Sequence, residues 1–121
     1  TFIDGGALGF DTIAAETVIE MREKYQNIKL VMYLPCYGQS KMWKESEQFR
    51  YRMVLSKADK IIYITESVYT DDCMKLRNLK MIKDSSFCIA FCLMQKSGTG
   101  FTLRNAENVG IEIVNIADEI Y

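Results

Sequence analysis

Histidine is absent from this chain of 121 residues, and proline occurs once, as Pro35. The absence of histidine removes the commonest general base and the commonest zinc ligand, and none of the four cysteines forms a C-x-x-C pair. The sequence therefore excludes a zinc site and a Cys-His nucleophile, and we predict no metal. The cysteines lie within or beside apolar stretches, which favours reduced thiols over disulfides.

Long apolar runs and a strong net charge are also missing. No run approaches the roughly 20 residues of a membrane span, and no signal segment opens the chain, so we predict a cytoplasmic protein without membrane contact. The net charge of -1 disfavours nucleic-acid binding, although the fifteen basic residues could still cluster on one face. The 49% hydrophobic content suits one packed domain over residues 1–121.

Apolar runs alternate with helical periodicity along the whole chain. Strands are predicted over residues 1–4, 29–34, 60–65, 86–94 and 111–116, and helices over 12–24, 42–56, 71–83 and 101–109. The run at 86–94 is the most apolar, which predicts a central strand. The alternation predicts a three-layer α/β/α fold with an open, mostly parallel sheet. Because the chain opens directly on a strand and without methionine, we expect an N-terminal truncation with a strand missing.

Two glycine-rich stretches each follow a predicted strand. The first, DGGALGFD, offers Gly5, Gly6, Ala7, Gly9 and Asp11, in a setting where backbone N–H groups and a helix N-terminus attract an anion. Gly9 is expected to allow close packing of helix on strand. A tight turn with Asp11 as the N-cap of the helix is the alternative.

The second glycine stretch, KSGTGFT, follows the most apolar run. Its candidate ligand-binding residues are Ser97, Gly98, Thr99, Gly100 and Thr102. The carboxyl ends of parallel strands lie at one edge of a sheet, so we expect both stretches to converge on one pocket.

Further candidates lie near the same predicted edge. Pro35, which closes the strand at 29–34, is itself a candidate ligand-binding residue. After it, Trp43 could stack on a base and Gln39 could hydrogen-bond its edge, although such a tryptophan often only packs. Arg77 and Asn78 could reach an anionic ligand, with a solvated face or a structural ion pair as the alternative. Glu66 and Asp11 are the acidic candidates for acid–base chemistry, but neither belongs to a visible carboxylate pair. The catalytic residues, if any, stay unknown.

Four segments, FIDGGALGFDTIAAE, LPCYGQSKMW, CMKLRNLKMIKDSS and KSGTGFTLRNA, together resemble the YpsA-like branch of the SLOG superfamily. These bacterial Rossmann-like proteins are related to DprA and to the LOG phosphoribohydrolases. The resemblance implies a nucleotide pocket at both glycine stretches, with Arg77 and Asn78 matching a recurrent pair. It also implies an N-terminal strand with a T-G-x-R-P type motif, which this chain lacks.

The function that the resemblance favours is binding or sensing of a nucleotide-derived ligand such as ADP-ribose or NAD, without a required cofactor. LOG-type hydrolases resemble one another in a P-G-G-x-G-T-x-x-E loop, whereas this chain reads S-G-T-G-F-T-L-R, so the expected glutamate is absent and a non-enzyme is favoured. Three alternatives stay open. They are a nucleoside-monophosphate N-glycosidase that uses Glu66 or Asp11, a DprA-like binder of single-stranded nucleic acid, and an interaction module or homo-oligomer that pairs through an open sheet edge.

Overall fold

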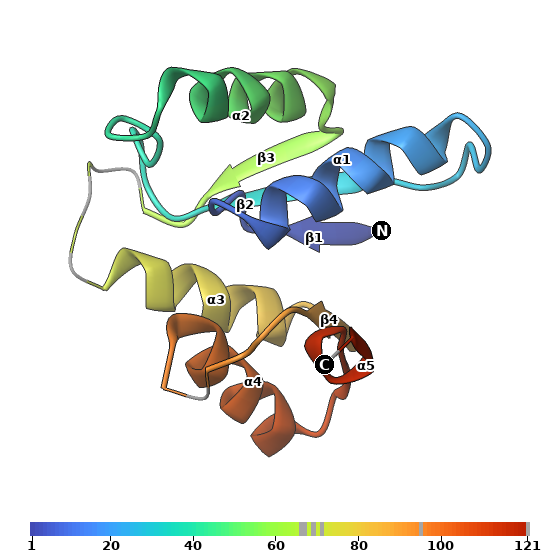
Figure 1. Cartoon of the computed structure of the whole chain (residues 1–121), viewed down its shortest axis with the longest axis vertical. Coiled ribbons are helices and arrows are strands. Elements are labelled where there is room, and N and C mark those ends of the chain that lie inside the picture. Colours follow the sequence, from blue (N-terminus) through green and yellow to red (C-terminus); the bar gives the residue numbers. More distant parts are fainter. Residues whose placement is uncertain (66–67, 69, 71, 95, 121) are drawn as a thin grey trace. The chain divides into compact units, whose positions relative to one another are not determined.

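Figure 1 shows the computed structural model of the chain, which describes residues 1–65, 68, 70, 72–94 and 96–120. The chain consists of two compact units, the first from Thr1 to Arg77 and the second from Asn78 onward. In each unit, helices connect parallel strands. Helix α3 (Cys73–Lys83) begins in the first unit and continues into the second. The prediction of a single domain stays a prediction.

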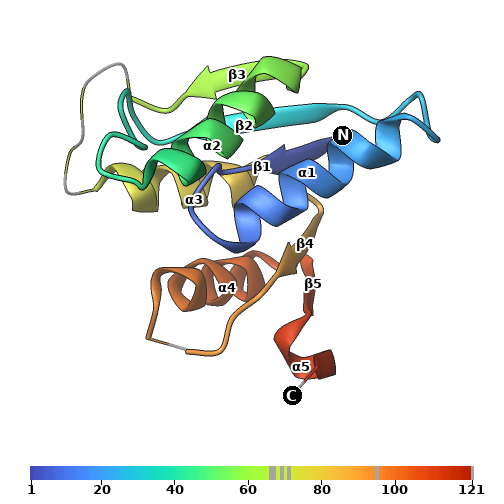
Figure 2. The same cartoon turned by 45° about the horizontal axis from the view of Figure 1, so that its top comes forward.

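The first unit is built on a parallel sheet with the strand order β1–β2–β3 (Figure 1). Its elements are β1 (Phe2–Asp4), α1 (Phe10–Arg22), β2 (Leu30–Leu34), α2 (Glu45–Lys57) and β3 (Lys60–Tyr63). Each connection leads to the neighbouring parallel strand, and such crossovers are right-handed. Both helices therefore lie on the same face of the sheet, where they contact each other (Figures 1 and 2).

The core of the first unit lies between β2 and these two helices. Every second residue of β2 is fully buried, at Leu30, Met32 and Leu34, because alternate side chains of a strand point to the same face. Helix α1 contributes Ala15 and Val18 at helical spacing, and α2 contributes Tyr51 and Val54. This packing fixes the carboxyl ends of β1 and β2, from which the candidate loops emerge.

An ionic contact holds the opposite, amino edge of the same sheet. Asp59, just before β3, accepts hydrogen bonds from the Leu30 N–H at 2.8 Å and from the Arg22 guanidinium at 2.7 Å. Arg22 also donates to the Lys57 carbonyl at 2.6 Å. The C-terminal ends of α1 and α2 are thereby tied to the start of the strands.

The second unit pairs β4 (Phe87–Ala90) with β5 (Glu112–Asn115) in parallel. Helix α4 (Gly98–Val109) connects the strands and ends at Gly110 in a left-handed conformation with φ of 82°. Asn115 extends the pairing beyond β4, because its side chain accepts from the Cys92 N–H and donates to the Cys92 carbonyl, both at 3.0 Å. A short helix, α5 (Ala117–Ile120), follows.

The predicted mixed α/β fold with parallel strands is confirmed, but the sheets are small. Where residues 86–94 were expected to form a central strand, β4 spans only residues 87–90 and pairs with β5 in a two-stranded sheet. The helix expected at 101–109 begins at Gly98, because Ser97 caps it. The helix expected at 71–83 is described from Cys73, and no acidic residue lies in its first turn.

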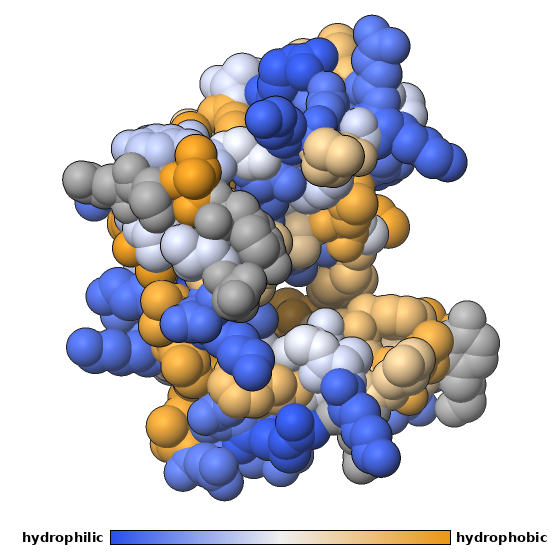
Figure 3. Space-filling view, turned by 90° about the vertical axis from the view of Figure 1, so that its left-hand side faces the viewer, coloured by the Kyte–Doolittle hydropathy of each residue, from blue (hydrophilic) through white to orange (hydrophobic). Residues whose placement is uncertain are grey.

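Helix α2 carries many of the hydrophilic side chains on one face of the first unit (Figure 3). Hydrophilic side chains gather over the end of the space-filling view that α2 occupies in Figure 1 (Figure 3). Arg50 of this helix pairs with Glu16 of α1 at 2.6 Å and with Glu47 at 3.5 Å.

None of the helices in the described part of the chain combines the length and the apolar character that a membrane crossing requires.

Candidate functional site

The loop between β1 and α1 is held by carboxylates of its own chain. The Gly6 N–H donates to Asp4 Oδ1 at 2.8 Å, and the Ala7 N–H donates to Asp11 Oδ2 at 3.2 Å. The Thr12 hydroxyl donates to the Ala7 carbonyl at 3.3 Å. Two of the N–H groups that the sequence offered to an anion therefore already have partners. Asp11 is also not the N-cap of α1, because that position is Gly9, which has no side chain to cap the helix.

Gly6 and Gly9 both have a backbone conformation that favours glycine, but their surroundings differ. Both have positive φ, +68° at Gly6 and +89° at Gly9, a region that residues with a side chain rarely adopt. A Cβ atom at Gly6 would lie 3.0 Å from Leu34 and 3.2 Å from Tyr51, whereas one at Gly9 would meet nothing within 4 Å. The expectation that Gly9 serves close packing of helix on strand is therefore wrong, because its surroundings are open.

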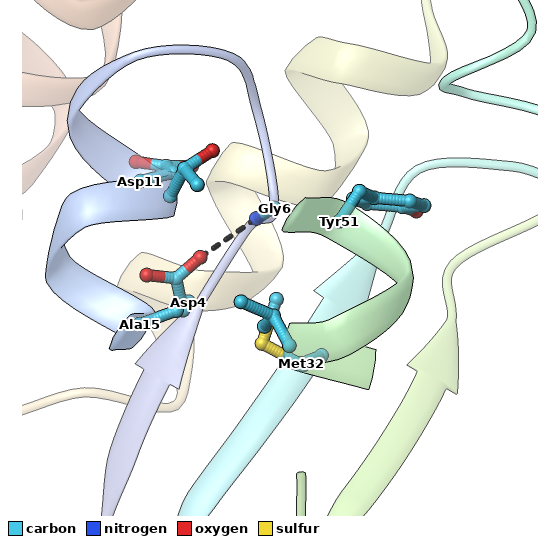
Figure 4. Close-up of a pocket in the computed structure, with 8 residues that line it drawn as sticks. Asp4, Gly6, Asp11, Ala15, Met32 and Tyr51 are labelled. Atoms are coloured by element: carbon cyan, nitrogen blue, oxygen red, sulfur yellow. Dashed lines mark hydrogen bonds between the residues drawn. The ribbon is translucent and has the colours of Figure 1, made fainter. Parts of the chain in front are cut away.

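A cavity of about 10 Å³ lies between the loop and the sheet. Figure 4 shows the side chains of Asp4 and Asp11 beside it, with Met32 and Tyr51 on its other sides. A volume of this size holds about one water molecule. The cavity is therefore too small to enclose a whole nucleotide.

Asp4 and Asp11 are close enough for the charge of one carboxyl to affect the other. Burial, followed by the charge of Asp11, raises the pKa of Asp4 to about 8, although the Gly6 hydrogen bond and Arg77 oppose the shift. Burial likewise raises the pKa of Asp11 above its ordinary value, against the Ala7 hydrogen bond and Arg77. A carboxyl that retains its proton near neutral pH can donate a hydrogen bond or a proton. The structure thus gives Asp11 a carboxyl neighbour, Asp4, that was not visible in the sequence.

Arg77 is the cation of this cluster. Only 4% of it is exposed, and its guanidinium donates to the Gly5 carbonyl and, at 3.5 Å, to Gln39 Oε1. A Cβ atom at Gly5 would lie 2.9 Å from the same guanidinium, so a residue without a side chain is required there. The interpretation of Arg77 as part of a solvated face is wrong. Asn78, the next residue, is half-buried and begins the second unit.

Gln39 connects the glycine loop to α2. Its amide nitrogen donates to the Gly6 carbonyl at 3.4 Å and to the Tyr51 hydroxyl at 3.2 Å, and 9% of the residue is exposed. Together with the contact from Arg77, these bonds use both ends of the amide. Gln39 therefore lies where the sequence placed it, at the carboxyl edge of the sheet, with partners from its own chain.

Trp43 and Pro35 have structural environments. The Trp43 ring meets the Tyr51 ring edge to face, with centroids 5.1 Å apart and planes at 74°, and it packs against the core. Pro35 is fully buried, and its carbonyl accepts hydrogen bonds from the Thr65 N–H and hydroxyl. These contacts support the packing interpretation of Trp43.

The second glycine stretch is the first turn of α4 rather than a loop before it. Ser97 is the N-cap, and its hydroxyl oxygen accepts from the Gly100 N–H at 3.1 Å. The Thr102 hydroxyl donates to the Gly98 carbonyl at 3.1 Å. Gly98 and Thr99 are exposed. This stretch belongs to the second unit, so its convergence with the first loop stays a prediction, and Glu66 lies outside the described residues.

Sequence reasoning missed three contributors to the cluster, namely Asp4, Thr12 and Tyr51. Asp4 carried a usable signal, because it is the last residue of an apolar strand and directly precedes Gly5-Gly6. An acidic residue at such a strand end faces the same edge as the loop that follows. Tyr51 carried no comparable signal, since its place in α2 is typical of an ordinary core residue.

Comparison with known proteins gives consistent matches over most of the chain. The family model YpsA, described as the YspA SLOG family, matches residues 1–110. A UPF0398 protein of Bacillus cereus strain B4264 is 35% identical over 98 residues, which are 80% of this chain and 53% of that protein. A UPF0398 protein of Bacillus thuringiensis strain Al Hakam is 34% identical over the same shares. The chain thus spans about half the length of the curated relatives it matches.

Proposed function

Because the chain belongs to the YspA SLOG family, we propose that it binds a nucleotide or a nucleotide-derived small molecule, such as ADP-ribose or NAD. The binding place is the carboxyl edge of the first unit's sheet, over the loop from Gly5 to Gly9. The observation that carries the proposal is the polar cluster beneath this loop, in which Asp4, Gln39 and Arg77 are buried and Asp11 is half-buried.

The chemistry of the cluster suits a ligand that carries both hydroxyls and phosphate. The Asp4–Asp11 pair can accept hydrogen bonds from ribose hydroxyls, and the small cavity that both residues help to line has room for one such group. Helix α1 starts without a side-chain cap beside the open surroundings of Gly9, which favours a negatively charged phosphate. The ligand therefore lies with its sugar toward the aspartates and its phosphate toward α1.

Calorimetry and thermal-shift measurements with ADP-ribose, NAD and AMP test the proposal. We expect one of these ligands to bind and to raise the melting temperature, and the Asp11→Asn variant to bind it at least tenfold more weakly. Asp59→Asn, at the amino edge of the sheet, is the matched control and should bind normally. If neither this chain nor a full-length UPF0398 relative binds any of the three, the proposal is wrong.

A second candidate function, hydrolysis of an N-glycosidic bond, is favoured by the raised pKa values of Asp4 and Asp11. A protonated carboxyl can protonate the departing base while a second carboxyl assists water. Incubation with AMP should then release adenine, and Asp4→Asn and Asp11→Asn should each abolish the release. Release that is no faster than in a blank without protein would exclude this candidate.

A further inference from the structure

Cys36 and Cys73 form a buried thiol pair. Cys36 directly follows Pro35 at the carboxyl end of β2, and Cys73 is the first residue of α3. Both are 0% exposed, and the Cys73 thiol donates to the Cys36 sulfur across 3.8 Å. Neither is in a disulfide. The other two cysteines, Cys88 and Cys92, are partly exposed and lie in the second unit.

We propose that Cys36 and Cys73 are a redox-active pair that closes into a reversible intramolecular disulfide. The oxidant is a small-molecule disulfide of the glutathione type. One cysteine thiolate attacks a sulfur of oxidised glutathione, which gives a mixed disulfide and expels one glutathione thiolate. The second cysteine thiolate then attacks the protein sulfur of that mixed disulfide and expels the second glutathione. The two protein thiols lose two electrons and two protons, and oxidised glutathione is reduced to two thiols.

The geometry favours closure between these two sulfurs. A disulfide bond is about 2.0 Å long, so the sulfur atoms must approach each other by roughly 1.8 Å from their separation of 3.8 Å. Rotation of the two side chains, together with a small shift of the first turn of α3, supplies a movement of this size. Terminal turns of helices open more readily than their centres, and Cys73 lies in such a turn.

Burial makes the reaction slow rather than impossible. Burial and the neighbouring Cys73 raise the pKa of the Cys36 thiol, and Arg77 opposes the shift only in part. Because the thiolate is the attacking species, few molecules react at neutral pH until the turn opens. The pair therefore responds to sustained oxidation and not to brief exposure.

The bridge would act on the polar cluster of the first unit. Cys73 and Arg77 are four residues apart on one face of α3, and Cys36 precedes Gln39 in the loop after β2. Arg77 and Gln39 both contact the glycine loop, at Gly5 and Gly6. A covalent link between Cys36 and Cys73 thus joins the two segments that hold this loop.

The test is equilibration of the whole chain in mixtures of oxidised and reduced glutathione, followed by alkylation and peptide mapping by mass spectrometry. Oxidation should leave two of the four cysteines alkylated and should yield a peptide pair linked through Cys36 and Cys73. The melting temperature should rise by roughly 5 °C, because the bond restricts the unfolded chain. Reduction by dithiothreitol should restore all four thiols.

Variants separate this pair from the other cysteines. Cys36→Ala or Cys73→Ala should remove the linked peptide, whereas the double variant Cys88→Ala, Cys92→Ala should still form it. If a variant fails to fold, peptide mapping of the unaltered chain still shows whether Cys36 and Cys73 form the disulfide. Four free thiols after equilibration under the most oxidising mixture, a bond through Cys88 or Cys92, or glutathione adducts alone would each overturn the proposal.

Discussion

Asp4 retains its proton at a pH at which most aspartates are charged. Its carboxyl still accepts the Gly6 N–H, so it contributes a hydrogen bond in either protonation state. Arg77 donates to the Gly5 carbonyl, one residue from Asp4. The site therefore holds one acidic pair and one cation in a small buried volume, where the protonation of one member affects the others.

The pKa of Asp4 predicts a stability that decreases with rising pH. The pKa is about 8 in the folded protein and about 3.9 in an unfolded chain, so between these values the folded state binds more protons. The free energy of unfolding must then fall as the pH rises, by at most about 1.4 kcal/mol per pH unit. Asp4→Asn keeps the acceptor for Gly6 but does not titrate. In urea denaturation from pH 5 to pH 8, the variant should gain stability relative to the unaltered chain.

Asp59→Asn is the control for this comparison. Its hydrogen bond from Leu30 and the neighbouring Arg22 hold the pKa of Asp59 below its ordinary value. The stability that Asp59 contributes is therefore already complete above the unfolded pKa and is lost only in more acidic solution. The stability difference for Asp59→Asn should stay constant from pH 5 to pH 8. A constant difference for Asp4→Asn as well would show that Asp4 is charged throughout.

Two glycines of the same loop should respond differently to alanine. Gly9→Ala should cost about 2 kcal/mol, because only the backbone conformation, with φ of 89° and ψ of -119°, opposes the side chain. Gly6→Ala should cost about 3 kcal/mol, because the new methyl group also meets Leu34, Tyr51 and Met32 at 3.0 to 3.3 Å. Urea denaturation of both variants measures the difference. Equal losses of stability in the two variants would mean that the core side chains around Gly6 move aside to accommodate the methyl group.

Helices α1 and α4 begin in opposite ways, although each follows a strand and carries glycine in or just before its first turn. Helix α4 has Ser97 as a side-chain cap, whereas α1 has Gly9 and no side-chain cap. The sequence predicted the later start at Phe101 because glycine is unfavourable inside a helix. The capping bond from Gly100 to Ser97 compensates for the two glycines in this turn.

Removal of this cap should loosen the start of α4. Ser97→Ala and Ser97→Gly both remove the hydroxyl that accepts from the Gly100 N–H. Alanine should cost about 1 kcal/mol, whereas glycine should cost only a few tenths because it is a favourable N-cap residue even without a side chain. Hydrogen exchange at the Gly100 amide reports the change directly and should become faster in the alanine variant. Unchanged exchange there would place the acceptor of this N–H elsewhere.

At the scale of the whole molecule, the order of elements followed from the sequence, but the extent of the sheet did not. The periods of apolar residues located β1 through β5 and four helices, since burial imposes those periods on each element separately. The lengths of strands depend on their neighbours. The apolar run that contains Phe87–Ala90 therefore predicted a longer and more central strand than the two-stranded sheet holds.

The candidate site was predictable to a similar degree. Gly5, Gly6, Asp11, Gln39 and Arg77 do come together around one loop, because strand ends and glycines are visible in a sequence. What each residue contacts was not visible. The occupation of the Gly6 and Ala7 amides by Asp4 and Asp11 depends on side-chain directions that no local pattern encodes.

The charge balance of the chain predicts weak binding to nucleic acid. With 15 basic and 16 acidic residues, few counterions can be released from a phosphate backbone. We expect a dissociation constant weaker than about 10⁻⁴ M for a single-stranded oligonucleotide at physiological salt, as measured by fluorescence anisotropy. Tight binding that falls steeply with added salt would instead support the DprA-like alternative.

The edge-to-face contact between Trp43 and Tyr51 gives the protein a built-in optical probe. Trp43 is the only tryptophan of the chain, and the hydroxyl of its aromatic neighbour accepts the hydrogen bond from Gln39. The indole is thus connected to the loop through two intervening side chains, because it contacts Tyr51, Tyr51 is hydrogen-bonded to Gln39, and Gln39 donates to the Gly6 carbonyl. Its ultraviolet emission can follow ligand occupancy or proton uptake at the aspartate pair without any attached dye.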